Sequence, residues 1–340
     1  MSDTLTKTPT DSESYIAEIV GEESLRGERI GAGKMLHLMD LAAATAAWKH
    51  ARTPLVTLAF DRIELLNMIC HMDYVKYEAY VIKVGKTSIC VKVDGFVKSP
   101  TEMEILPAHS GVITMVSIDE NKKPNPNIPK LVYLSEKDVE RKSFVENREK
   151  LKAERKKIVS EIAALNDIPI EALKDFYHRK SYVTPKQTEL KIQKVFLPKN
   201  VNSLGIVFGG ETIELMEELA LATARQFSGN FQMVTIAMED VYFLKPLYLN
   251  NLVEMISMVT FVGNTTLTVD IIVKTCDSFD LSNSHITNKG TFTILNYDRS
   301  GRKKTISTGL NMNESDFESR KLYLQEQKKY KIIKKIDPQS

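Results

Sequence analysis

The sequence predicts an α+β protein built from two tandem copies of one unit, each with one long helix and a strongly curved antiparallel sheet. The first observation is a repeat, since residues 56–60 (VTLAF) recur as residues 234–238 (VTIAM) and residues 84–88 recur as residues 262–266, both with an offset of 178 residues. The second is that an apolar helical segment precedes several strand-like segments in both copies. The length of 340 residues also agrees with two domains.

Each unit begins with a short strand and a glycine-containing segment that leads into the helix. We expect the strands at about residues 14–20 and 188–197, and the helices at about residues 33–50 and 210–228. Residues 34–50 are rich in Ala and apolar almost all round, as expected of a helix wrapped by a sheet. The segments that follow, such as residues 74–84 and 252–262, have strand length and many β-branched or aromatic residues.

The two units are separated by a segment of different composition. It contains a charge-laced helix that starts after Ser135, which is either a solvated linker or a helix along the rim of a ligand cleft that offers cations. A second basic helix runs from Phe317 to about Lys335. The expected organisation is a flexible N-terminus (1–12), a first domain (13–130), a charged helical linker (131–187), a second domain (188–312) and a C-terminal basic helix (313–340).

Composition and charge exclude several functional classes. Lys and Arg total 46 against 44 Asp and Glu, and the net charge of +2 predicts no nucleic-acid partner. No window of ~18 residues is apolar enough to predict a transmembrane segment. The three cysteines have no C-x-x-C spacing, so we expect no zinc or other metal site. The N-terminal residues lack an apolar signal region, and elimination therefore favours the cytoplasm.

Residues 26–40 (RGERIGAGKMLHLMD) and residues 197–210 (LPKNVNSLGIVFGG) resemble the paired motifs of tandem hotdog acyl-CoA thioesterases. The likeness covers roughly residues 14–335. With an Asp in the first half and an Asn in the second, the order is closest to the cytosolic acetyl-CoA hydrolase and brown-fat-inducible branch, and we expect no lipid-transfer domain.

The resemblance implies two hotdog domains packed as an intramolecular double hotdog. It implies hydrolysis of acyl-CoA to free fatty acid and CoA, with no cofactor apart from the CoA of substrate and product. It also implies a homo-oligomer, a trimer of double hotdogs. The alternative function is a non-catalytic acyl-CoA-binding or sensing protein.

Thioester hydrolysis needs a group that activates water and donors for the developing oxyanion. Asp40 lies within an otherwise apolar helix face, where a carboxylate is expensive to bury, and is therefore a candidate catalytic residue. Asn202 occupies the amide position of the family, although its sequence context alone is typical of a turn. If the two helices pack antiparallel, we expect Asp40 and Asn202 to meet across the domain interface.

The repeat also predicts a second site, possible or degenerate, in which Glu217 replaces the aspartate and Leu25 replaces the asparagine; Glu218 is an alternative alignment for Glu217. Gly33 and Gly210 lie at the helix starts, where free N–H groups suit an oxyanion. Whether the acid acts as a general base or forms a transient anhydride stays open.

The remaining site residues follow from the resemblance to CoA-binding regions of the family. Extended backbone could bind the pantetheine amides and hydroxyls the phosphates or amides, whereas plain strand packing is the alternative explanation. The candidates are Leu58, Ala59, Phe60, Thr87, Ser88, Arg148, Ile236, Ala237 and Met238. His37 and His50 have no catalytic spacing and are expected at the surface, and Trp48 is expected to be a packing anchor.

Overall fold

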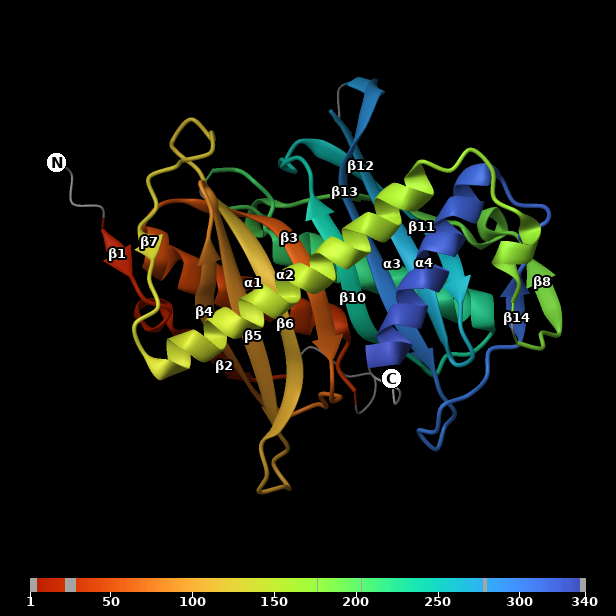
Figure 1. Cartoon of the computed structure of the whole chain (residues 1–340), viewed down its shortest axis with the longest axis horizontal. Coiled ribbons are helices and arrows are strands. Elements are labelled where there is room, and N and C mark those ends of the chain that lie inside the picture. Colours follow the sequence, from red (N-terminus) through yellow and green to blue (C-terminus); the bar gives the residue numbers. More distant parts are fainter. Residues whose placement is uncertain (1–4, 22–28, 176, 203, 278–279, 337–340) are drawn as a thin grey trace.

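The computed structural model describes residues 5–21, 29–175, 177–202, 204–277 and 280–336. Within these residues the main sheet has ten antiparallel strands, and the two halves of the chain join edge to edge through β3 and β10 (Figure 1). In spatial order the strands are β2 (Ser14–Ile19), β4 (Tyr74–Val84), β5 (Ser88–Lys98), β6 (Leu106–Ser117), β3 (Leu55–Leu65), β10 (Met233–Phe243), β13 (Asp280–Asn296), β12 (Thr266–Asp277), β11 (Asn251–Val262) and β9 (Leu190–Val195).

Two long helices, α1 (Ala32–Ala51) and α3 (Gly209–Ser228), pack against each other and against one face of this sheet, here called the inner face (Figure 1). Their bounds lie within one residue of the predicted ones. Small residues such as Ala42, Ala46 and Ala220 are fully buried, so the helices approach closely. One continuous apolar core includes residues from both helices and both halves of the sheet. The predicted α+β fold of two tandem hotdog units packed as a double hotdog is therefore confirmed.

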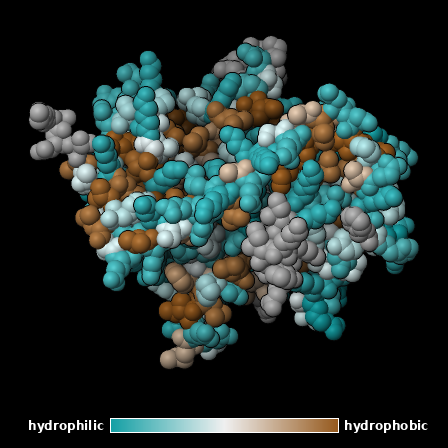
Figure 2. Space-filling view, viewed as in Figure 1, coloured by the Kyte–Doolittle hydropathy of each residue, from teal (hydrophilic) through white to brown (hydrophobic). Residues whose placement is uncertain are grey.

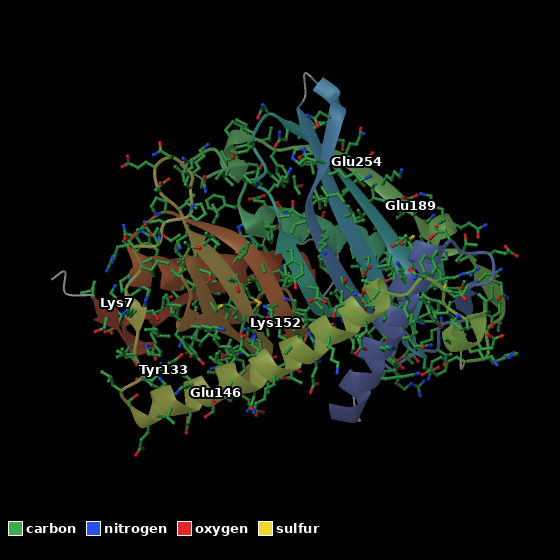
Figure 3. All side chains as sticks on the ribbon, turned by 45° about the horizontal axis from the view of Figure 1, so that its top comes forward. Lys7, Tyr133, Glu146, Lys152, Glu189 and Glu254 are labelled. Atoms are coloured by element: carbon green, nitrogen blue, oxygen red, sulfur yellow. The ribbon has the colours of Figure 1, made fainter. Side chains whose placement is uncertain are left out.

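The other two helices, α2 (Glu136–Ala163) and α4 (Phe317–Ile336), lie on the opposite, outer face of the sheet (Figures 1 and 3). The face that they form is mainly hydrophilic (Figure 2). Ser135 caps α2 in a capping box with Asp138, as the sequence suggested for the helix start. The expectation of a solvated linker helix is wrong for part of α2, because Val145 and Ile162 are buried against the rest of the protein.

Helix α2 also makes ion pairs with both halves of the sheet. Arg148 and Lys152 pair with Asp61 of β3, and Arg155 pairs with Glu239 of β10 at 3.3 Å. These cations therefore hold the helix across the β3–β10 junction. Their carboxylate partners come from separate strands, and for this reason the sequence did not reveal where the helix lies.

Residues 6–12, expected to be flexible, have defined structure. Strand β1 (Thr6–Lys7) pairs with β7 (Lys130–Leu131), and Thr10–Ser12 form the short helix η1. Ser12 is fully buried, and its hydroxyl accepts a hydrogen bond from the N–H of Val81 at 2.9 Å. The other short elements are η2 (Ile170–Leu173), β8 (Ser181–Val183), η3 (Pro185–Thr188), η4 (Pro198–Asn200) and β14 (Thr308–Leu310).

Two expectations for the end of α1 are wrong. His50 is fully buried, with Nε2 2.9 Å from the carbonyl oxygen of Pro129, whereas Trp48 is 50% exposed and stacks with the Arg52 guanidinium. Residues two apart in a helix point to nearly opposite sides. The sequence interpretation placed Trp48 on the core face of α1, and it therefore placed His50 on the exposed face. No helix of the described residues is long and apolar enough to cross a membrane.

Candidate active site

Asp40 lies at the contact between α1 and α3, where it joins the two halves of the chain. Its side chain is on the inner face and only 3% exposed. Oδ1 accepts a hydrogen bond from the hydroxyl of Thr57 on β3 at 2.9 Å. Oδ2 accepts a hydrogen bond from the backbone N–H of Gly210, in the first turn of α3, at 2.8 Å. The acid thus comes from one half and one of its two donors from the other.

Glycine at the start of α3 permits this approach. A Cβ atom on Gly209 would lie 2.7 Å from Thr57 Oγ1 and 3.1 Å from Asp40 Oδ2. A Cβ atom on Gly210 would lie 3.0 Å from the ring of His37. The first turn of a helix carries unpaired N–H groups and the positive end of the helix dipole, which favour a carboxylate. The Gly-Gly pair therefore brings a favourable donor directly to Asp40.

Burial makes the Asp40 carboxyl a weaker acid than an ordinary aspartate. Removal from water raises the pKa of this carboxyl to about 6, although the hydrogen bonds from Thr57 and Gly210 lower it. The group is therefore largely ionised at neutral pH and remains basic enough to take a proton. Such a pKa suits a general base.

Glu217 repeats this arrangement in the other half. Its Oε1 accepts a hydrogen bond from the hydroxyl of Thr235 on β10 at 2.5 Å, and its Oε2 accepts one from the N–H of Gly33 on α1 at 3.3 Å. Burial likewise raises the pKa of Glu217. The alignment of Glu217 rather than Glu218 with Asp40 thus agrees with the structure. Each acid has a threonine from its own half and a glycine N–H from the opposite helix.

Asn202 lies in the loop that leads into α3, eight positions before Gly210, and is held mainly by its own loop. Its side-chain oxygen accepts hydrogen bonds from the N–H groups of Leu204 at 3.0 Å and Ile206 at 3.1 Å. In the described part of the chain no hydrogen bond joins Asn202 to Asp40. The structure therefore brings Asp40 to the helix that follows Asn202, but does not join the two side chains. Leu25, its counterpart in the first half, lies outside the described residues.

His37 belongs to this contact region, which the sequence reasoning missed. Its Nδ1 lies 3.5 Å from Glu214 of α3, and this pairing raises the pKa of the imidazole. The expectation of a surface residue is wrong because only 20% of its side chain is exposed. The repeat offset of 177 residues between the two helices relates His37 to Glu214. That relation could have placed both near the local two-fold axis.

The predicted CoA-binding residues occupy several places on the sheet. Leu58 is 39% exposed at an irregularity in β3, whereas Ala59 and Phe60 are buried. Thr87 and Ser88 lie at the β4–β5 turn, near the end of the sheet where β3 begins, since Ser88 and Val56 both pair with Val116. The remaining residues of this group, Ile236, Ala237 and Met238, lie in β10, where Ala237 and Met238 pair with the far end of β3.

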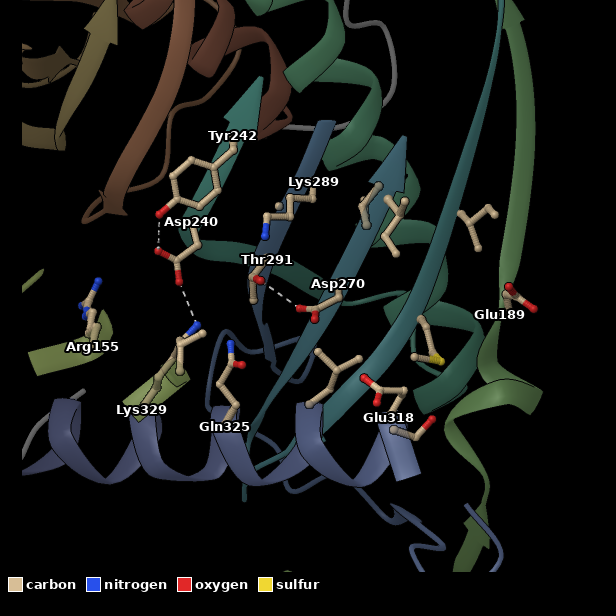
Figure 4. A pocket seen from close by; sticks show the side chains of 18 of the residues that line it. Arg155, Glu189, Asp240, Tyr242, Asp270, Lys289, Thr291, Glu318, Gln325 and Lys329 are labelled. Carbon is tan, nitrogen blue, oxygen red and sulfur yellow. Dashed lines mark hydrogen bonds and ion pairs between the residues drawn. The ribbon is translucent and has the colours of Figure 1, made fainter. Parts of the chain in front are cut away.

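Arg148 is not brought to Asp40. It lies on α2, on the outer face of the sheet, in an ion pair with Asp61. A cavity of about 760 Å³ lies further along this outer face, between the sheet, α2 and α4. Both Lys329 of α4 and Asp240 of β10 line this cavity (Figure 4). They form an ion pair of 2.8 Å. The cavity lining contains both cations and carboxylates, and the sheet separates it from α1 and α3.

No group of three or more His, Cys, Asp or Glu side chains in the described residues could hold a metal ion. Two buried carboxylates, Asp40 and Glu217, lie at the contact between α1 and α3. Both have oriented hydrogen-bond donors.

Comparison with known proteins identifies one family model that matches both halves. The model described as the thioesterase superfamily matches residues 32–104 and residues 204–278. A Zymomonas mobilis protein named as an uncharacterized acyl-CoA thioester hydrolase is 34% identical over 96 residues, which cover 28% of this chain and 64% of that protein. Human mitochondrial acyl-coenzyme A thioesterase 9 is 27% identical over 263 residues, which cover 70% of this chain and 59% of that protein.

Among solved structures, an acyl-CoA hydrolase from Bacillus cereus is 26% identical, with a TM-score of 0.42. The likeness covers 48% of this chain and 99% of that chain. This chain spans less than two thirds of the length of the curated relatives described above.

Proposed function

We propose that this protein is an acyl-CoA thioesterase that hydrolyses acyl-CoA to free fatty acid and CoA at the Asp40 site. The observation that carries the proposal is the buried Asp40 carboxylate, held by Thr57 and by the N–H of Gly210. The names of the relatives support the same chemistry. The proposed reaction uses water and needs no cofactor.

In the proposed mechanism Asp40 acts as a general base. A water molecule attacks the thioester carbonyl carbon while the Asp40 carboxylate takes its proton. The carbonyl oxygen becomes an oxyanion, for which we assign donors to the first turn of α3. The intermediate then expels the CoA sulfur, which receives the proton from Asp40. Among the hydrogen bonds of the described residues, none involves the side-chain nitrogen of Asn202. We assign this nitrogen as a hydrogen-bond donor to the attacking water or to the thioester carbonyl.

The role of Thr57 in this proposal is to orient the base. Its hydroxyl donates to one carboxylate oxygen and lowers the pKa of Asp40, against the effect of burial. Gly210 does the same for the other oxygen from the opposite half. The unused lone pairs of both oxygens remain available for a water proton.

Glu217 is a second candidate for the same chemistry because it has the same set of donors. Its side chain is one methylene longer than that of Asp40, so its carboxylate needs a different backbone position to reach a thioester. We assign the main activity to Asp40 because Asn202 lies in the loop before Gly210, which is the glycine that contacts Asp40.

The test is hydrolysis of a panel of acyl-CoAs by wild type, Asp40→Asn and Glu217→Gln, with a thiol-reactive dye that detects free CoA. We expect Asp40→Asn to abolish CoA release and Glu217→Gln to retain most of it. Loss in Glu217→Gln alone would assign the reaction to the second site. If folded wild type binds acyl-CoA but releases no CoA from any substrate, the alternative of an acyl-CoA-binding or sensing protein replaces the enzyme.

Three further expectations belong to this proposal. We infer a trimer of double hotdogs, which light scattering after size-exclusion chromatography would measure. The cytoplasmic location remains a prediction, and the human relative is named as mitochondrial. The assignment to the cytosolic acetyl-CoA hydrolase and brown-fat-inducible branch also remains a prediction.

A further inference from the structure

In the described residues of the second half, two neighbouring buried side chains, Asn288 and Thr275, have polar atoms without a hydrogen-bond partner. Asn288 on β13 is fully buried, and neither its side-chain nitrogen nor its side-chain oxygen has a hydrogen bond. Thr275 on β12 is 2% exposed, and its hydroxyl is also unpartnered. Buried polar groups in folded proteins are nearly always hydrogen-bonded, so two unpaired ones in one place need an explanation.

Both side chains point to the inner face, toward the core shared with α3. Along β13, Gly290 faces Met216 of α3 and Phe292 belongs to the core, and strand alternation places Asn288 on the same side. Along β12, Val273 belongs to the core, and Thr275 follows it on the same face. The register pairs Val273 with Asn288, so the two unpartnered groups are close neighbours.

The strand register also places Asn288 at the level of the Asp40 site. Ala59 of β3 pairs with Tyr242 of β10, and the next residue, Phe243, pairs with Asn288. Asn288 is therefore two strands away from the beginning of β3, where Thr57 lies. Two strand spacings correspond to roughly 10 Å across the sheet. The apolar ring of Phe243 lies between them and contacts that of Phe60, with centroids 6.0 Å apart.

The loops at this end of the sheet connect the two places as well. The N–H of Val207, in the loop between Asn202 and α3, donates to the carbonyl of Leu247 at 2.9 Å. Both residues are buried in the core. The segment that enters the first turn of α3 is thus hydrogen-bonded to the loop after β10, and in that loop the N–H of Leu244 donates to the carbonyl of Thr287, the neighbour of Asn288, at 2.7 Å.

The equivalent position in the first half is occupied differently. Gly95 corresponds to Val273 by the repeat offset, and the sheet partner of Gly95 is His109. Nδ1 of His109 is 2.6 Å from the hydroxyl of Tyr77, and both side chains are buried. In the second half Met255 replaces Tyr77, and the amide of Asn288 is left unpaired. The first half thus satisfies its polar group internally, whereas the second half does not.

We propose that Asn288 and Thr275 form the far end of the acyl subsite of the Asp40 site and bind a hydrogen-bonding oxygen on the acyl chain. This proposal rests on the proposed function, since it names the substrate class of the same site. The Asn288 amide nitrogen donates to the acyl oxygen, and its carbonyl oxygen accepts from an acyl hydroxyl. The favoured substrates are acyl-CoAs that carry a hydroxyl group at a distance from the thioester, rather than plain alkyl acyl-CoAs.

The physical reason for selectivity is the unpaired amide itself. A plain alkyl chain leaves both Asn288 atoms without a partner in an apolar core, whereas a hydroxylated chain satisfies them. Sites built around buried polar groups discriminate against ligands that lack the matching group more strongly than apolar pockets reject an added one. We therefore expect selectivity of about tenfold or more in favour of the hydroxylated chain.

The experiment compares ω-hydroxyacyl-CoAs with plain acyl-CoAs of equal length, from about four to eight carbons, a range set by the separation across two strands. kcat and KM are measured separately for wild type, Asn288→Leu, Thr275→Val and Tyr77→Phe. We expect wild type to prefer the hydroxylated member at one length or more. Asn288→Leu, which keeps the side-chain size, should bring the ratio of kcat/KM values close to one, mainly through KM. Thr275→Val should reduce the ratio in the same direction and provides the test if Asn288→Leu does not fold.

Tyr77→Phe is the matched control because it removes the hydrogen bond at the equivalent place in the first half. It should leave the ratio unchanged, whatever it does to stability. A wild-type enzyme without preference at any length would overturn the proposal, as would a preference that persists in both Asn288→Leu and Thr275→Val. In that case the amide holds only buried water.

A binding measurement separates this proposal from the proposed function. Thioether analogues, in which alkyl or ω-hydroxyalkyl chains are attached to the CoA sulfur, cannot be hydrolysed, and their Kd values can be measured by calorimetry. If wild type hydrolyses no acyl-CoA but binds the hydroxylated thioether more tightly, and Asn288→Leu removes the difference, the enzyme assignment fails while the subsite stands. Equal Kd values for the two thioethers, at every length tested, would reject the subsite even if hydrolysis is observed.

Discussion

Replacing Asp40 with Asn should make the folded protein more stable while it removes the activity. The folded-state pKa of Asp40 is about 6, against an ordinary value of 3.8, because the carboxyl is buried. One pKa unit corresponds to about 1.36 kcal/mol, so the ionised carboxylate lowers the free energy of unfolding by about 3 kcal/mol at pH 8. Asparagine removes this term. Its oxygen can accept from Gly210, and its NH2 group can donate to the Thr57 hydroxyl.

The pH dependence identifies the cause of the stabilisation. Below pH 3.8 Asp40 is protonated in the folded and the unfolded chain, and its ionisation has no effect on stability. As the pH rises toward 6 the unfolded chain ionises first, so stability is lost, and the loss is complete once the folded carboxyl has also ionised. The contribution works out at about 1 kcal/mol at pH 4.5 and about 3 kcal/mol at pH 8.

The assay is urea unfolding of wild type and Asp40→Asn at both pH values, followed by far-UV circular dichroism and by Trp48 fluorescence. Coincident transitions would justify a two-state treatment. The stability difference between the two proteins should grow by about 2 kcal/mol from the lower to the higher pH. A difference that does not change with pH, or a variant that is less stable at pH 8, would refute the burial argument. Glu217→Gln should behave in the same direction because burial raises the pKa of Glu217 too.

The remaining predictions concern the same carboxylate and the helix that holds it. The value of kcat/KM should rise tenfold per pH unit below about pH 6 and become constant above it, following the pKa of Asp40, and a flat pH–rate profile would contradict the general-base role. Thr57→Val should move that inflection to higher pH and lower kcat about tenfold, because the hydroxyl lowers the pKa of Asp40; an unchanged inflection would argue against it. Gly210→Ala should lower stability by about 1 to 3 kcal/mol and reduce activity, since its Cβ atom would lie 3.0 Å from His37. Gly31→Ala is the control, because a Cβ atom there meets nothing within 4 Å, and thermal unfolding with the CoA-release assay checks both variants.

The two long helices and the pairing of the two halves could be predicted from the sequence. The hydrophobic pattern of each helix and the internal repeat both indicated the same arrangement. Residues 34–50 are apolar on nearly all sides, and only a helix enclosed by a sheet satisfies that pattern. The repeat offset then gave the second helix and its glycines. Asp40 stood out because a carboxylate in such a helix has few partners, and the structure places Thr57 and Gly210 around it.

Other features depended on contacts that the sequence pattern does not encode. The resemblance predicts a catalytic role for Asn202, whereas its sequence context alone predicts a turn, and the structure shows its side-chain oxygen bonded to the N–H groups of Leu204 and Ile206. The position of α2 depends on single ion pairs with Asp61 and Glu239, which lie far away in the sequence. The short strand β1 is two residues long and pairs with residues more than a hundred positions away, so no local signal distinguishes it from a flexible terminus.

Each half of the chain supplies a backbone hydrogen-bond donor to the acid of the other half. In a chain that contains both halves, the two acid sites can therefore differ, as they cannot in a dimer of identical subunits. Asp40 takes an N–H from Gly210, and Glu217 takes one from Gly33, so each half completes the acid site of the other. In a dimer of identical subunits every substitution appears in both sites. In a fused chain each substitution appears once, so one site can keep an aspartate while the other carries a glutamate.

The same freedom applies to the core beside each acid. Along the sheet, the Tyr77–His109 pair lies on the side of the Glu217 site, because His109 pairs with Leu65 at the end of β3 that lies beside the beginning of β10. Asn288 lies on the side of the Asp40 site. The buried polar groups beside Glu217 are hydrogen-bonded to each other, whereas the side-chain polar atoms of Asn288, on the side of Asp40, have no partner among the described residues. This difference is expected if only the Asp40 site binds a polar ligand. We therefore assign Asn288 and Asp40 to the same proposed site, although 248 positions separate them in the chain.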